Sequence, residues 1–431
     1  MRKLQLAMPA VILLAVVLAF SQAANAEEGI IGPSEVSTGE NVVFSVDLGS
    51  NASYAYVYEW TVDNGTPEYG PSLSHVFNTT GFYNVTLVVK NVTTGQPVSG
   101  LTFSHMVEVS PDQSGMFLAV IGAGLAVGVS GMGAGIGVGI AGSAGAGALA
   151  DRPKKFSKFF VFQALPQTQA IYGLLVAILI FLNTGLLTGG DAEVPFAAGM
   201  LYIGAGLAVG IAGLSAIGQG IAAGAGIGAY AEKDEMFTRG IIFSVMPETQ
   251  AIYGLIISVL LIFIAGDPAT FGSRPDAMGS ALIGVGAGLA VGAAGLSAIG
   301  QGIAAASSIG AVSEKKEVFS RGVVFTVMPE TQAIYGLLVG ILLIFLGGLG
   351  GDSEVFNTLG RGFVAIGAGL AVGVAGLSAI GQGISAGAGI SSFARNSDTF
   401  TRSLIFSAMS ETFAIFGLLI AILAMLFAGF F

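Results

Sequence analysis

The stretch "PETQAIYG" occurs twice in the sequence, at Pro247–Gly254 and at Pro329–Gly336. Two variants complete a series of four, "PQTQAIYG" at Pro166–Gly173 and "SETFAIFG" at Ser410–Gly417. All four lie inside long apolar stretches, and apolar runs of roughly 20 residues are typical of membrane-spanning helices. Three of the four therefore place a glutamate deep in an apolar segment, and the rest of the chain is best interpreted outward from this series.

The motif belongs to a repeat of about 82 residues that begins at Met116. Each repeat has a Gly-rich apolar half with "GAGLAVG", then a short charged loop, then a second apolar half that holds the motif. Such a unit predicts a transmembrane helical hairpin. We therefore predict an all-α membrane protein with four hairpins and eight helices, over residues 116–187, 195–266, 278–348 and 361–431.

The glycines of the first helices do not predict a nucleotide site, because their spacing is wrong and no strand precedes them. Small residues at every third or fourth position instead let helix backbones approach closely in lipid. We therefore expect the first helices to pack tightly, as the inner wall of a ring.

The composition agrees with a membrane protein, since 53% of the 431 residues are hydrophobic and 10% are charged. The absence of cysteine excludes disulfides and thiolate metal sites. The net charge of -10 is uneven, because the segment from Glu27 to Asp112 holds ten acids and one base, Lys90. That acidic, polar segment predicts a separate soluble domain and argues against nucleic acid as a partner.

The first 26 residues have the pattern of a signal peptide, with Arg2 and Lys3, an apolar run and "ANA" at positions 24–26. A retained membrane anchor is the alternative, and with either one the following segment lies outside the cytoplasm. Lys and Arg of the membrane part gather in the four hairpin loops, with Arg274 and Arg361 as exceptions. This bias predicts a multi-pass cell-membrane protein with cytoplasmic loops.

Residues 29–112 predict a small extracytoplasmic β-sandwich, since runs such as "NVVFSVDL" alternate with Asn, Gly and Pro turns. The stretches "YEWTVDNG" and "SHVFNTTGFYNVTLVV" resemble the PKD family of β-sandwich modules. His75 and His105 are expected to be ordinary surface or packing residues. The segment holds five glycosylation sequons, which either carry glycans or follow from an Asn- and Thr-rich composition. They are Asn51, Asn64, Asn78, Asn84 and Asn91.

The candidate functional residues are the buried acids Glu248, Glu330 and Glu411. Such residues are costly in lipid and indicate function by default, although a protonated Glu could merely tie two helices together. Each acid follows a glutamine of "AIGQG" by 29 residues, and the midpoint of each pair falls in a charged loop, so that the two side chains lie at one depth. The three glutamines are Gln219, Gln301 and Gln382.

The motif also has a polar face. Thr249, Gln250 and Tyr253 share one side of their helix, whereas Glu248 points to the opposite flank. A single hairpin therefore cannot close the site, and each must combine with its neighbours. The prolines at 166, 247 and 329 free backbone carbonyls. Carboxylate, amide, hydroxyl and carbonyl oxygens suit a hard cation, which favours Na⁺ while leaving H⁺ open.

Residues 116–431 resemble the proteolipid, or rotor-ring, subunits of archaeal A-type and V-type rotary ATPases, on the strength of "PETQAIYG" paired with "GLSAIGQG". The resemblance implies a ring made of copies of the chain, in contact with membrane lipid. It implies that the ring turns against a stator membrane subunit that bears an arginine. It also implies that the ring is joined to central-stalk subunits. It also implies that ion flow is coupled to ATP synthesis or hydrolysis by a non-catalytic, ion-translocating subunit without an organic cofactor.

The resemblance further implies how each Na⁺ site is shared. One hairpin supplies Thr, Gln, Tyr and the carbonyl before Pro, and the next supplies Gln and Glu. The three sets are Thr168, Gln169, Tyr172 and the Leu165 carbonyl with Gln219 and Glu248; Thr249, Gln250, Tyr253 and the Met246 carbonyl with Gln301 and Glu330; and Thr331, Gln332, Tyr335 and the Met328 carbonyl with Gln382 and Glu411.

The fourth junction joins hairpin 4 to hairpin 1 of the next chain. There the polar face has become Phe413 and Phe416, and the acid side has become Gln167 and Gly137. We therefore predict three sites per chain and a silent junction between chains, with independent drift as the alternative explanation.

Two other functions fit parts of the sequence. A glycosylated surface or adhesion protein could use the hairpins as an anchor, but an anchor needs no repeated acids at matched depth. A multi-span channel or carrier is the other, for which broken helices and more varied polar residues are expected.

Overall fold

The computed structural model describes residues 29–49, 55–63, 65–189, 192–349 and 357–431. The chain divides into two compact units, Met1–Asp112 and Gln113–Phe431, and each is described by itself. The predicted signal peptide and the sequons at Asn51 and Asn64 lie outside the described residues.

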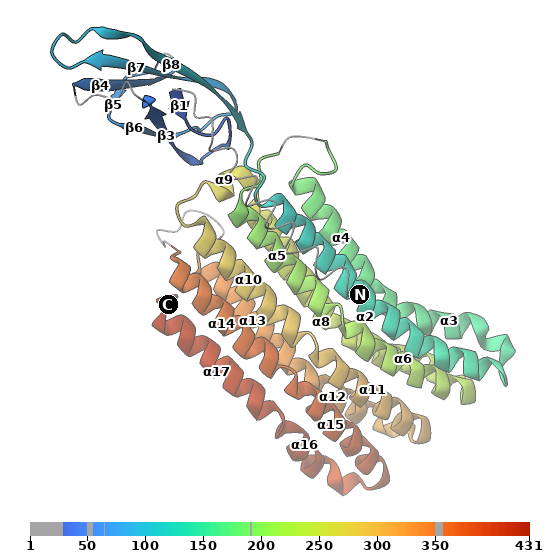
Figure 1. Ribbon diagram of the computed structural model, residues 1–431. Coiled ribbons are helices and arrows are strands. Elements are labelled where there is room, and N and C mark those ends of the chain that lie inside the picture. Colours follow the sequence, from blue (N-terminus) through green and yellow to red (C-terminus); the bar gives the residue numbers. More distant parts are fainter. Residues whose placement is uncertain (1–28, 50–54, 64, 190–191, 350–356) are drawn as a thin grey trace, which may run out of the picture. The chain divides into compact units, whose positions relative to one another are not determined.

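The N-terminal unit is built from two β-sheets, with strand orders β1-β3-β6 and β2-β8-β7-β4-β5 (Figure 1). The strands alternate inward and outward residues, so that Phe44, Trp60 and Leu87 share one buried core. His75 and His105 pack near Phe77 and Phe44, as expected for ordinary residues. The strands are β1 (Gly29–Ile31), β2 (Glu35–Ser37), β3 (Asn41–Asp47), β4 (Tyr56–Val62), β5 (Glu68–Tyr69), β6 (Ser72–Val76), β7 (Gly81–Asn91) and β8 (Pro97–Ser110).

Within the described residues, the second unit has eight helical spans long and apolar enough to cross a membrane, which confirms the predicted fold class. They form four hairpins that follow one another in chain order (Figure 1). The first spans are α2 (Met116–Leu149), α5 (Phe196–Ala212) with α6 (Ser215–Glu232), α10 (Ala277–Ala294) with α11 (Ser297–Glu314), and α14 (Leu359–Ala375) with α15 (Ser378–Arg395). The second spans are α3 (Phe156–Ala164) with α4 (Thr168–Asn183), α7 (Met236–Val245) with α8 (Thr249–Ala265), α12 (Phe319–Val327) with α13 (Thr331–Leu346), and α16 (Phe400–Ala408) with α17 (Glu411–Phe427). A short α9 (Pro268–Gly272) lies between hairpins 2 and 3.

The first spans pack against one another through glycine. A Cβ atom added to Gly218 would lie 1.9 Å from the carbonyl oxygen of Ala298, and one added to Gly300 would lie 2.0 Å from that of Ala379. Only residues without a side chain permit this backbone contact, so the predicted close packing of the first helices is present.

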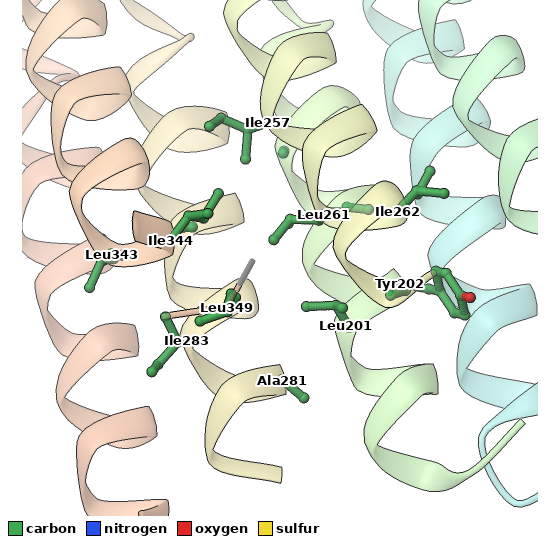
Figure 2. Packing of buried hydrophobic residues seen from close by; sticks show 14 of the residues in the cluster. Leu201, Tyr202, Ile257, Leu261, Ile262, Ala281, Ile283, Leu343, Ile344 and Leu349 are labelled. Carbon is green, nitrogen blue, oxygen red and sulfur yellow. The ribbon is translucent and has the colours of Figure 1, made fainter. Parts of the chain in front are cut away.

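Larger side chains also pack between these spans, in the α5 and α10 segments. Leu201 of α5 and Leu261 of α8 both approach Gly284 of α10, and each leucine is fully buried. Figure 2 shows Leu201 and Leu261 together with Ile283 and Ile344 in this cluster. Hairpins 2 and 3 are thus held against each other both by glycine contacts and by buried aliphatic side chains.

The first spans of hairpins 2, 3 and 4 are interrupted at equivalent positions, whereas α2 is continuous. The interruptions fall at Gly213–Leu214, Gly295–Leu296 and Gly376–Leu377, directly before a serine. At the first of them the backbone bonds run three residues back, as from Leu214 N–H to the Ile211 carbonyl. Because of the break, the helical segment that carries the glutamine does not continue the rotational register of the segment before it.

Candidate functional sites between the hairpins

The second spans bend into short 3₁₀ turns where the motif has proline. These turns are η4 (Leu165–Gln167), η5 (Met246–Glu248) and η7 (Met328–Glu330). Proline has no N–H. In all three turns the hydroxyl of the next threonine lies 3.0–3.1 Å from the carbonyl before the proline, and it shares its one proton between that carbonyl and the Oε1 of the following glutamine. In hairpin 4, where Ser410 replaces proline, a plain turn stands in this place. In hairpins 2 and 3 the turn sets a carboxylate and a Thr-Gln-Tyr face on opposite flanks, whereas hairpin 1 has only the polar face and hairpin 4 only the carboxylate.

The first cluster joins hairpins 1 and 2 around Glu248. Tyr172 donates to Glu248 Oε1 over 2.7 Å, and Gln219 Nε2 donates to Glu248 Oε2 over 3.2 Å. Gln169 Nε2 donates to Gln219 Oε1 over 2.8 Å, and Thr168 donates to Gln169 Oε1 over 3.1 Å. Both carboxylate oxygens therefore accept hydrogen bonds, one from each hairpin.

The second cluster repeats this arrangement around Glu330, between hairpins 2 and 3. Tyr253 donates to Glu330 Oε1 and Gln301 Nε2 to Oε2, each over 3.1 Å. Gln250 Nε2 donates to Gln301 Oε1 over 2.7 Å, and Thr249 donates to Gln250 Oε1 over 3.1 Å.

The third cluster surrounds Glu411, between hairpins 3 and 4. Tyr335 donates to Glu411 Oε1 over 2.7 Å, and Gln382 Nε2 donates to Oε2 over 3.3 Å. Gln332 Nε2 donates to Gln382 Oε1 over 2.6 Å, and Thr331 donates to Gln332 Oε1 over 3.1 Å. The structure thus brings all the sequence-predicted side chains together, in the pairing of each hairpin with the next.

Each cluster offers a cation only oxygen ligands and the single negative charge of its carboxylate. The glutamines Gln169, Gln219, Gln250, Gln301, Gln332 and Gln382 are fully buried. Among the described residues no group of three or more His, Cys, Asp or Glu could hold a metal ion. One carboxylate neutralises one positive charge, so the clusters fit a monovalent cation or a proton better than a divalent metal.

Comparison with known proteins shows the family of the membrane part. The model of the ATP synthase subunit-C family matches four times, at residues 121–180, 203–261, 285–343 and 366–424. The chain belongs to this family. The PKD domain model matches residues 30–95. The chain is thus a proteolipid with four fused hairpins and an N-terminal PKD module.

Three relatives from this family are matched over most of their own length. The A-type ATP synthase subunit K of Methanocaldococcus jannaschii is 51% identical over 54% of this chain and 97% of that protein. The V-type sodium ATPase subunit K of Enterococcus hirae is 41% identical over 35% and 94%. The 16 kDa proteolipid of the V-type proton ATPase of Homo sapiens is 32% identical over 34% and 90%.

The free ends of the proteolipid differ from its internal junctions. Phe413 and Phe416 of hairpin 4 are 63% and 56% exposed and lie edge to face, and Gln167 of hairpin 1 is exposed too. Within the part of the chain that the structure describes, neither free end therefore presents a carboxylate or a Thr-Gln-Tyr face.

The sequence prediction was wrong in one position of hairpin 1. A Cβ on Gly137 would lie 2.1 Å from the Ala216 carbonyl, the same contact that Gly218 makes with Ala298. Gly137 is therefore equivalent to Gly218, and Val138 rather than Gly137 occupies the place of Gln219. The physical reason is that α2 runs through without the break and contains one residue more.

The basic residues of the loops were predicted to set the topology, but their hydrogen bonds between hairpins were not predicted from the sequence. Arg152 Nε donates to the Ala231 carbonyl over 3.1 Å, Lys315 donates to the Ala394 carbonyl over 2.8 Å, and Lys233 donates to the Ser313 carbonyl. Each bond ties a loop to the end of the next hairpin's first span, where helical carbonyls lack partners. Arg152, Lys233 and Lys315 occupy equivalent positions in the first three charged loops, and hairpin 4 has Asn396 at that position. This repeated basic residue is the sequence signal for the contacts.

Ion pairs add to these loop contacts. Lys155 pairs with Asp234 at 2.6 Å, and Lys316 pairs with Glu235 at 2.5 Å. The hydrogen bond from the lysine lowers the pKa of each carboxyl below its ordinary value. These exposed pairs therefore orient the loops at neutral pH and are lost as the pH falls through the lowered pKa.

Proposed function

We propose that the chain is the rotor-ring subunit of an A/V-type ATP synthase or ATPase and that Glu248, Glu330 and Glu411 carry the transported Na⁺. The observation that carries the proposal is the threefold cluster in which two hairpins surround one carboxylate with amide, hydroxyl and carbonyl oxygens. A proton carrier needs the carboxyl alone, whereas these extra oxygens suit a hard cation.

The residues divide the work of transport. When an ion binds, the glutamate charge is neutralised, so that the site can face lipid at small cost. Gln169 and Gln219 are buried amides that have both an oxygen, which can ligate the ion in the loaded site, and an NH₂ group, which donates to Gln219 Oε1 or to Glu248 when no ion is bound. At the stator, an arginine of the neighbouring membrane subunit would compete for the carboxylate and release the ion. Central-stalk subunits would then transmit rotation to the ATP-handling part.

Carbodiimide modification of the three glutamates tests this proposal in purified rings. Modification requires a protonated carboxyl, so millimolar Na⁺ at neutral pH should slow it at Glu248, Glu330 and Glu411, read separately by peptide mass spectrometry. Absence of Na⁺ protection, with faster modification in acid, would assign the sites to protons instead.

The same proposal places the β-sandwich outside the cytoplasm and the four charged loops inside. It rests on the Lys and Arg bias of those loops. Protease added to intact cells should clip residues 29–112 and spare Lys233 and Lys315. Cleavage at either lysine from outside would reverse the topology.

A further inference from the structure

Three equivalent serines stand out among the buried polar groups. The hydroxyl oxygens of Ser215, Ser297 and Ser378 are shielded from solvent and have no hydrogen-bond partner within the described residues. The whole side chains of Ser215 and Ser297 are also fully buried. A buried hydroxyl without a hydrogen-bond partner is unfavourable, and here the same exception occurs three times.

Other serine hydroxyls in the membrane helices do have hydrogen-bond partners. Ser130 donates to the Ala126 carbonyl over 2.6 Å, and Ser244 donates to the Gly240 carbonyl over 2.7 Å, each one turn back. This is the usual way to satisfy a serine inside a helix. Ser215 lies directly after the break, where the backbone hydrogen bonds run three residues back, as from the Leu214 N–H to the Ile211 carbonyl. The regular helical turn that brings a serine hydroxyl to the carbonyl four residues back is interrupted there.

The three serines lie next to the carboxylate clusters. Within hairpin 2, Gly254 packs against Ala212, and six residues earlier Glu248 meets Gln219. Ser215 falls between these two levels, inside the hairpin and one turn before Gln219. A long side chain on a helix leans toward the N-terminus, so the Gln219 amide extends back over the turn that carries Ser215. Ser297 and Ser378 occupy the equivalent positions, each between the packed glycine of its hairpin, Gly336 or Gly417, and its glutamine.

The serine is present in the hairpins that carry the glutamine and the glutamate, and it is absent from hairpin 1, which makes the same helix contacts without them. Hairpins 2, 3 and 4 have the break, the serine, the glutamine and the glutamate together. Hairpin 1 packs against hairpin 2 through the same glycine contact, yet α2 is continuous and has Gly133 and Ala134 in this region. Helix packing alone therefore does not require the serine.

We propose that each of these serines holds one water molecule against the adjacent glutamine and that this water belongs to the coordination shell of the bound cation. The inference rests on the proposed ion-carrying function. One helical turn is about 5.4 Å, too long for a direct bond between the hydroxyl and the ion. A hydrogen bond of about 2.8 Å between the hydroxyl and the water, followed by ligation of the ion by the water oxygen, covers that distance. The glutamine still has a second N–H and a second lone pair with which to bind the water.

The carbodiimide assay on purified rings tests the inference with controls inside each chain. In Ser215→Ala rings, the Na⁺ concentration that half-protects Glu248 should rise about fivefold, as expected for one lost water-mediated hydrogen bond. Glu330 and Glu411 of the same chains should keep their parental values. Ser297→Ala and Ser378→Ala should move the effect to Glu330 and Glu411, and they replace Ser215→Ala if its rings do not assemble.

Ser130→Ala is the matched control, because that hydroxyl is already bonded within its own helix, and all three glutamates should respond as in the parent. Equal protection of every glutamate in the serine variants, or a change at all three together, would overturn the inference. Parental rings that show no Na⁺ protection would refute the proposed function itself, whatever the serine variants do.

Discussion

At the scale of single residues, each glutamate depends on two hairpins at once. Its Oε1 accepts from a tyrosine of the preceding hairpin, and its Oε2 accepts from a glutamine of its own. Nearness in the sequence is therefore a poor guide to function here. Tyr253 is five residues from Glu248 in the chain, yet it contacts Glu330.

Replacing Tyr253 by phenylalanine should therefore affect Glu330 and spare Glu248. The ring is retained and only the hydroxyl is lost, at a cost of about 1.5–3 kcal/mol for a bond to a charged group. We expect the half-protecting Na⁺ concentration at Glu330 to rise about tenfold or more, measured glutamate by glutamate. A response at Glu248 would mean that the pairing runs in the other direction.

At the scale of helices, the small residues separate into contact and non-contact positions. A Cβ at Gly218 would collide with the Ala298 carbonyl at 1.9 Å, whereas one at Gly228 would meet nothing within 4 Å. Both glycines lie in α6, so their local helical context is the same. Their substitutions compare the cost of packing with the gain in helix propensity.

Gly218→Ala should separate hairpins 2 and 3 and destabilise the ring by about 1–3 kcal/mol or more. Gly228→Ala should be neutral or stabilise its helix by about 0.5–1 kcal/mol. The temperature at which detergent-solubilised rings dissociate, followed by gel filtration, measures both. Equal losses in the two variants would contradict the close contact between hairpins.

Much of the site could be predicted from the sequence, because a constant spacing of 29 residues between Gln and Glu fixes the depth of both side chains. The breaks before Ser215, Ser297 and Ser378 could not, since Gly-Leu-Ser in a glycine-rich helix carries no distinct stop signal. Missing the break also produced the one-residue error at Gly137. The loop bonds from Arg152 and Lys315 depend on side-chain direction, which composition does not specify.

At the scale of the whole molecule, four hairpins form three clusters. The free face of hairpin 4 has Phe413 and Phe416, and the free face of hairpin 1 has Gln167 and Val138. In a ring of such chains these faces meet at each junction between copies. Neither supplies the groups that the other would need.

Bound Na⁺ should therefore number three per chain, counted by sodium analysis of purified rings. Gln167→Glu alone should leave the number at three, because no polar face meets the new carboxylate. Combining it with Val138→Gln, Phe413→Gln and Phe416→Tyr supplies both halves and should raise the number to four. Four ions per chain in the parent would refute this scheme.

The junction between copies should nevertheless reuse one internal contact. Phe162 and Phe325 are fully buried against Gly226 and Gly389 of the following hairpins, whereas the equivalent Phe406 is 69% exposed. Gly145 of hairpin 1 is the equivalent of Gly226.

Because the chain has no cysteine, Phe406→Cys with Gly145→Cys should give oxidation ladders of several chains on denaturing gels. The matched pair Phe325→Cys with Gly389→Cys should cross-link only within one chain. Absence of a ladder, with successful cross-linking of the internal pair, would show that the copies meet by another face.

Under the proposed function, the unpaired junction has a consequence for energy conversion. The free energy available from ATP per revolution is set by the ATP-handling part, whereas the number of ions carried per revolution is set by the ring. With one of four hairpins carrying nothing, the same work is divided among three quarters as many ions. More free energy is then available for each ion, so that each ion can be driven against a steeper gradient. In return, the rotor must cross one empty interval per chain on thermal motion or stored torsion alone.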